Sequence, residues 1–242
     1  MADDPSGGDQ VKRAEGDSRV AAPWHTLVVI AILAAWAYRG VLRAAELRSV
    51  VGDHRVGFYA QTIAAEWILL GVVLLGVWLH QGRFSSVLGQ QWNSVQEAGR
   101  DFGIGLLFWL GSTVVLATVA SLLRSTAKSR DVEFLLPHGG AEKLLWIALS
   151  VSAGICEEAV FRGYLQQQFL ALTRSAPAAI LISGILFGLA HAYQGWRGGA
   201  VIGTLGVMLG MLAHWRGTVR TGMIAHAWQD SVAGLLGGLI KH

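Results

Sequence analysis

Six ionisable residues in the second half of the chain lie within blocks of otherwise apolar residues. They are Glu157, Glu158, Arg162, His191, His226 and Asp230. A charge at the centre of a membrane-spanning helix costs about 2.5–3.5 kcal/mol, so such residues generally have a partner or a function. We therefore expect the chemistry of this protein to depend on these six residues.

The two adjacent glutamates are predicted to have different roles. On a helix, Glu158 and Arg162 are four residues apart and lie on one face, in the favourable order for an ion pair. Glu157 lies about 100° further around the helix and is left without that partner. We predict that Glu158 and Arg162 form a structural pair. Glu157 is then a free carboxylate in apolar surroundings, where it can act as a general base.

Two histidines and an aspartate follow on later apolar segments. His191 is near the end of the segment ILFGLAHAYQ, and His226 is followed four residues later by Asp230. This spacing places His226 and Asp230 on one face of a helix, where the carboxylate can fix the imidazole tautomer or join it in binding an ion.

These groups fit two kinds of hydrolytic chemistry. His191, His226 and Asp230 form a familiar ligand set for Zn²⁺ with an open position for water, and Glu157 could take the proton from that water as it attacks a peptide carbonyl. Without a metal, Glu157 and one histidine would activate water while the other histidine and Asp230 stabilise the oxyanion. Both interpretations remain open at this level.

The composition indicates what kind of elements position these residues. The 242 residues are 53% hydrophobic and only 14% charged, against roughly 25% charged in a typical soluble domain. Apolar residues gather in blocks of about 15 to 23, which is close to the length that crosses the hydrocarbon core of a bilayer. The segment from Phe58 to His80 contains a single acidic or basic residue besides its terminal histidine, which excludes an ordinary soluble helix. We predict an all-α, polytopic transmembrane bundle.

The apolar blocks and the segments around them define the predicted organisation. Residues 1–22 form a polar tail that we expect to be disordered, and residues 23–123 form N-terminal transmembrane helices. A polar loop over 124–142 leads to the catalytic transmembrane helices of 143–242. The predicted spans cover residues 24–45, 58–80, 101–123, 144–165, 176–193, 199–214 and 219–240.

Partners and location follow from the same features. The net charge of +3 requires no nucleic acid, because basic loops beside anionic lipid headgroups account for it. The single cysteine, Cys156, excludes an internal disulfide and a cysteine-based zinc site. We expect an integral, multi-pass protein of the plasma (inner) membrane, with the lipid bilayer and a membrane-associated peptide or protein substrate as partners.

Three short motifs resemble those of one protease family. EEAVFR, Glu157 to Arg162, resembles the EExxxR motif of the CPBP intramembrane proteases, which include CAAX prenyl endopeptidases and bacteriocin-processing enzymes. FGLAH, Phe187 to His191, is similar to the FxxxH motif of that family, and HAWQD, His226 to Asp230, is similar to HxxxN/D. The motifs occur in the family's order and cover roughly residues 143 to 240.

The resemblance implies a function for each of these residues. It implies a helical bundle of about seven to eight spans that cleaves a peptide bond within or beside the membrane. Glu157 would be the catalytic base, with His191, His226 and Asp230 as the other site residues. Glu158 and Arg162 would be the supporting pair. Asp230 stands where many members have asparagine, and its added negative charge favours metal binding.

Two alternative functions fit part of the pattern. Intramembrane glutamate, histidine and aspartate also mark the relays of proton-coupled transporters, although those usually show repeat symmetry and interrupted helices in both halves. A non-catalytic immunity or scaffold protein could keep the same fold. Other intramembrane proteases fit poorly, because the HExxH, GxSG and GxGD motifs are absent from the sequence.

Overall fold

The computed structural model describes residues 19–123 and 133–237, and no strand occurs among these residues. The prediction of an all-α bundle is therefore confirmed. The predicted disordered tail lies largely outside the described residues, as do half of the predicted polar loop and the last residues of the seventh predicted span. The helical elements are α2 (Pro23–Leu79), α3 (Ser85–Leu88), α4 (Val95–Leu122), η2 (Glu133–Leu135), α5 (Gly140–Glu158), η3 (Ala159–Leu165), α6 (Gln166–Thr173), α7 (Ala176–Ala190), η4 (Ala192–Gln194), α8 (Gly195–Arg216) and α9 (Arg220–Gly237).

Five of the described helical stretches are long and apolar enough to cross a membrane. They are Pro23–Arg43, His54–Leu79, Val95–Leu122, Gly140–Thr173 and Ala192–Arg216. The helix α7, at the fifth predicted span, is apolar but shorter. The helix α9 occupies the described part of the seventh predicted span. The described residues of all seven predicted segments are thus mainly helical, as expected for a polytopic membrane protein.

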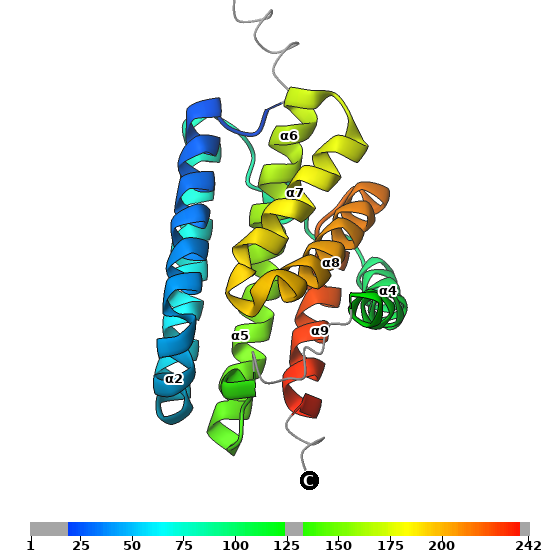
Figure 1. The fold of residues 1–242 in the computed structure, drawn as a ribbon. Coiled ribbons are helices and arrows are strands. Elements are labelled where there is room, and N and C mark those ends of the chain that lie inside the picture. Colours follow the sequence, from blue (N-terminus) through cyan, green and yellow to red (C-terminus); the bar gives the residue numbers. More distant parts are fainter. Residues whose placement is uncertain (1–18, 124–132, 238–242) are drawn as a thin grey trace, which may run out of the picture.

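The first two predicted spans form one folded-back element. The backbone of α2 leaves helical geometry at His54, and Figure 1 shows its blue and cyan halves lying side by side. His25 joins the two halves, because its Nε2 lies 3.0 Å from the carbonyl oxygen of Val72. Its Nδ1 lies 2.7 Å from the hydroxyl of Tyr164, which ties the folded-back element to η3.

The helix α4 begins earlier than the predicted start at Asp101. Ser94 is its N-cap and accepts a hydrogen bond from the backbone N–H of Glu97 at 3.1 Å. Glu97 in turn accepts from the backbone N–H of Asn93 at 2.9 Å. These two hydrogen bonds satisfy the backbone N–H of Glu97 in the first turn and that of Asn93 just before the helix.

The helix α5 lies at the centre of the arrangement. It packs against α2 on one side and α9 on the other, as Figure 1 shows. At Gly154, a Cβ atom would lie only 2.7 Å from the carbonyl oxygen of Met223 and 2.9 Å from the Cβ of Ala227, so α5 and α9 approach closely there. A glycine at this position is required by the close contact.

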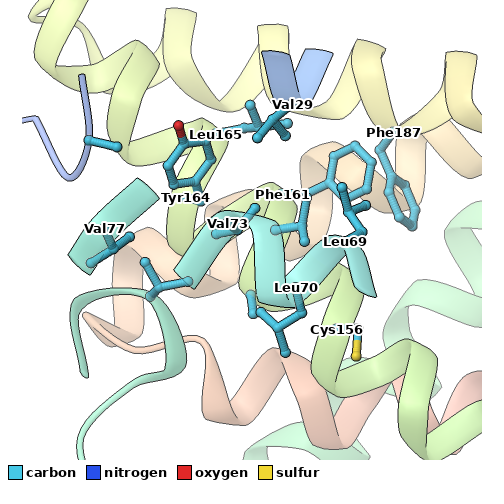
Figure 2. Close-up of a cluster of buried hydrophobic side chains, with 14 residues drawn as sticks. Val29, Leu69, Leu70, Val73, Val77, Cys156, Phe161, Tyr164, Leu165 and Phe187 are labelled. Carbon is cyan, nitrogen blue, oxygen red and sulfur yellow. The ribbon is translucent and has the colours of Figure 1, made fainter. Parts of the chain in front are cut away.

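An apolar core lies between α2, η3 and α7. Figure 2 shows Leu69, Leu70 and Val73 of α2 close to Phe161 of η3 and Phe187 of α7. These side chains are at most 6% exposed. The core therefore holds the folded-back α2, the N-terminal hairpin, against the segment that carries EEAVFR.

The segment η3 is a π-helix that directly follows α5. Every residue in it is buried. π-helical turns are rare and occur frequently at functional sites. Gly163, in the middle of η3, packs against α3, where an added Cβ would overlap the backbone carbonyl of Val87.

The Gly163→Ala variant is expected to be less stable than the natural protein by about 1–3 kcal/mol, because the contact with α3 is with rigid backbone. A chemical unfolding titration in detergent, followed by tryptophan fluorescence, measures this difference. Gly103→Ala is the control, since a Cβ there meets nothing within 4 Å and alanine favours a helix. Equal unfolding midpoints for Gly163→Ala and the natural protein would contradict the prediction.

Candidate active site

Glu158 and Arg162 form the ion pair that their spacing predicts. NH1 of Arg162 donates to Oε1 of Glu158 at 2.7 Å, and both side chains are 0% exposed. NH2 of Arg162 donates to the carbonyl oxygen of Gly206 on α8 at 3.0 Å. The guanidinium also lies over the ring of Phe187, 4.3 Å from its centroid. The arginine therefore connects three helical elements around one buried carboxylate.

Glu157 is not part of that pair. Its side chain is 21% exposed, and its Oε2 lies 3.7 Å from Nε2 of His226. This oxygen is buried and has no hydrogen-bond partner. Glu157 is thus a carboxylate with spare acceptor capacity beside an imidazole.

His226 lies among three carboxylates. Its Nδ1 is 3.1 Å from Oε1 of Glu158, while its Nε2 is 3.4 Å from Oδ2 of Asp230. Oε1 of Glu158 already accepts from Arg162, so Nδ1 of His226 is the donor in its contact with Glu158. That arrangement directs Nε2 toward Glu157 and Asp230. The side chain of Asp230 is 37% exposed, so this edge of the cluster is open.

His191 lies next to this cluster and is linked to it through an aromatic ring. It caps the C-terminal end of α7, and its Nδ1 lies 2.9 Å from the carbonyl oxygen of Phe187. The ring of Phe187 packs against His191 at 4.9 Å and against His226 at 5.8 Å between centroids. Because Nδ1 donates to a carbonyl, Nε2 of neutral His191 is an acceptor.

The predicted zinc ligands do not form a three-ligand group as the side chains lie. Among the described residues, no group of three or more histidine, cysteine, aspartate or glutamate side chains has an arrangement that could hold a metal ion. Nε2 of His226 faces Asp230 and Glu157, and His191 directs Nδ1 to its own helix. Zinc binding by His191, His226 and Asp230 stays a prediction.

Two residues that the motifs did not indicate also reach the cluster. Glu66 on α2 accepts a 2.6 Å hydrogen bond from Ser152 of α5, and it interacts electrostatically with Glu157 and His226. The sequence signal for Glu66 was its position as the one carboxylate in a long apolar segment. No such signal identified Ser152.

A third buried carboxylate, Asp101 of α4, fixes the start of α9. It is 0% exposed and accepts hydrogen bonds of 2.8 Å from Trp92 Nε1, 2.9 Å from Arg216 and 2.9 Å from the hydroxyl of Thr221. Thr221 precedes His226 by five residues on α9. Asp101 therefore sets the position of the helix that carries His226.

A bundle of long apolar helices that buries carboxylates, an arginine and a histidine together defines a polytopic membrane protein with a site suited to acid–base chemistry. Residues 140–232 match the model of a family described as Rce1-like type II CAAX prenyl endopeptidases. The match includes all three motifs, so the resemblance to CAAX proteases noted from them is confirmed. No curated protein and no solved structure has significant similarity to the chain.

Proposed function

We propose that this protein is an intramembrane endopeptidase that hydrolyses a peptide bond in a membrane-associated or lipidated substrate, with Glu157 as the general base. The observation that supports this role best is the separation of the two glutamates. Arg162 forms its ion pair with Glu158, whereas Oε2 of Glu157 lies 3.7 Å from Nε2 of His226. We place the protein in the plasma (inner) membrane.

In the proposed reaction, Glu157 and Nε2 of His191 orient a water molecule, and Glu157 takes its proton as the water oxygen attacks the peptide carbonyl carbon. The carbonyl becomes a tetrahedral oxyanion, which accepts a hydrogen bond from protonated His226. Asp230 and Glu158 stabilise that imidazolium from its two sides. Glu157 then gives its proton to the amide nitrogen, the C–N bond breaks, and a carboxylic acid and an amine are released.

The match of residues 140–232 to a CAAX prenyl endopeptidase model favours the protease over the proton-coupled transporter. The second alternative, a non-catalytic immunity or scaffold protein, would have no need of an unpaired carboxylate beside a buried imidazole. Both alternatives predict that purified protein cleaves no peptide.

His226→Ala is expected to lower the cleavage rate by about 10²–10³-fold, because it removes the proposed oxyanion donor. The assay follows peptide cleavage by mass spectrometry in liposomes that contain the purified protein. Prenylated and unprenylated CaaX peptides of one sequence serve as substrates, so their relative rates identify the substrate class.

The control for His226→Ala is His214→Ala, an exposed histidine on α8 that should retain the rate of the natural protein. His191→Ala tests, in the same assay, the proposed role of Nε2 of His191 in orienting the attacking water. Full activity of His226→Ala would contradict its role, and substrate uptake into liposomes without cleavage would favour the transporter.

The zinc prediction is tested separately in this assay. If His191, His226 and Asp230 bind the ion, a chelator should abolish cleavage and added Zn²⁺ should restore it. A rate unchanged by the chelator, with no metal found in the purified protein, would contradict the zinc site and leave the role of Glu157 intact.

A further inference from the structure

A buried carboxylate from the N-terminal half of the chain contacts the helix that carries the proposed base. Glu66 is 9% exposed, and its Oε2 accepts a 2.6 Å hydrogen bond from Oγ of Ser152, which is itself 5% exposed. Neither residue belongs to the three motifs, and Glu66 lies outside the matched segment 140–232. Removing one partner of a buried hydrogen bond is costly, because the other group is left without water or a replacement.

The C-terminal end of α5 needs contacts that fix its rotation. After Glu158 the chain continues as the π-helix η3, so the regular α-helical pattern that would hold this turn ends there. On the α9 side, Gly154 meets the backbone around Met223 without a side chain that could interlock. Hydrogen bonds made by neighbouring side chains of α5 therefore add to the packing of the buried Cys156 in setting the direction of Glu157.

Two such sets of hydrogen bonds flank Glu157 in the sequence. Glu158 is held by Arg162, and His226 lies 3.1 Å from the same carboxylate. Ser152, five residues before Glu157, is held by Glu66. The step from Ser152 to Glu157 is less than one and a half helical turns, so a shift at Ser152 is transmitted to Glu157.

We propose that Glu66 is a positioning residue of the active site: by accepting the hydrogen bond from Ser152, it holds the last turns of α5 at the rotation in which Glu157 faces His226. The N-terminal hairpin thus contributes to the geometry of a site whose motifs all lie in the second half. This inference rests on the proposed function of Glu157.

The test measures kcat and KM of peptide cleavage in liposomes for variants of the pair. Glu66→Ala should lower kcat by about 10- to 100-fold, as expected for a misplaced catalytic group, and change KM by less than about twofold. Glu66→Gln should restore most of the lost rate, because its amide oxygen can accept the same hydrogen bond. Ser152→Ala should lower kcat, and the double variant with Glu66→Ala should be no slower than the slower single variant.

The matched control is Glu142→Gln. Glu142 lies near the start of α5 and forms another contact to α2, with Arg55 at 3.8 Å. If the contact of Glu66 merely held α2 against α5, Glu66→Ala would lower stability and leave kcat unchanged, as we expect kcat to be in Glu142→Gln. Of these two variants, we expect only Glu66→Ala to lower kcat.

Several outcomes would overturn the positioning role. An unchanged kcat in Glu66→Ala, multiplicative losses in the double variant, or a folded Glu66→Gln as slow as Glu66→Ala would each contradict it. The proposed function fails by a different result, namely absence of cleavage by the natural protein or full activity of Glu157→Gln. The two failures are therefore distinguishable in one experiment.

Discussion

Glu157→Gln is expected to abolish measurable peptide cleavage, with a rate at least about 10²–10⁴-fold below that of the natural protein. The amide has nearly the shape of the carboxylate but cannot take the proton from water or return it to the leaving nitrogen. Glu157 makes no ion pair with Arg162, and its Oε2 has no hydrogen-bond partner. The substitution should therefore leave the folded state intact.

Initial rates in liposomes and an unfolding titration in detergent, made on the same preparation, measure both parts of this prediction. Glu142→Gln is the control for changing a carboxylate to an amide on the same helix, because Glu142 contacts Arg55 far from the site. Full activity of Glu157→Gln would exclude Glu157 as the base. A loss of rate accompanied by unfolding would assign Glu157 a structural role instead.

Arg162→Ala is expected to destabilise the protein by about 3–5 kcal/mol, since it leaves the carboxylate of Glu158 buried without its partner. The variant also loses the hydrogen bond to Gly206 and the contact of the guanidinium with the ring of Phe187. Because native proteins are stable by only about 5–15 kcal/mol, this loss should lower the yield of folded variant.

Unfolding titrations of the folded fraction in detergent measure this effect. Arg100→Ala, at an exposed position on α4, controls for the loss of an arginine. The stability of Arg162→Lys should lie between that of Arg162→Ala and that of the natural protein. An ammonium group keeps the charge but lacks the planar fork that reaches both Glu158 and Gly206. The double change of Arg162→Met with Glu158→Gln should recover part of the lost stability, since no charge then remains unpaired. Natural stability in Arg162→Ala would contradict the importance of the pair.

The sequence by itself determined the contacts that form within one helix. Two pairs have a spacing of four residues. NH1 of Arg162 lies 2.7 Å from Oε1 of Glu158, and Nε2 of His226 lies 3.4 Å from Oδ2 of Asp230. The geometry of an α-helix brings His226 and Asp230 together whatever α9 packs against, and the Glu158–Arg162 pair forms although Arg162 lies in the π-helix η3. The helices themselves followed from the apolar blocks, because only a helix satisfies the backbone of an isolated apolar segment in lipid.

Only the tertiary structure decided which helices bring their side chains together. The approach of α9 to α5 at Gly154 places His226 beside Glu157, and the folded-back α2 brings Glu66 to Ser152. The ring of Phe187 on α7 packs against His226 on α9. These contacts join residues far apart in the chain, and they depend on close packing at particular small residues and on the break in α2 at His54. The periodicity of one segment contains no information about packing between helices or about the break in α2. The motifs therefore identified Glu157, the proposed base, but not Glu66, the residue proposed to position it.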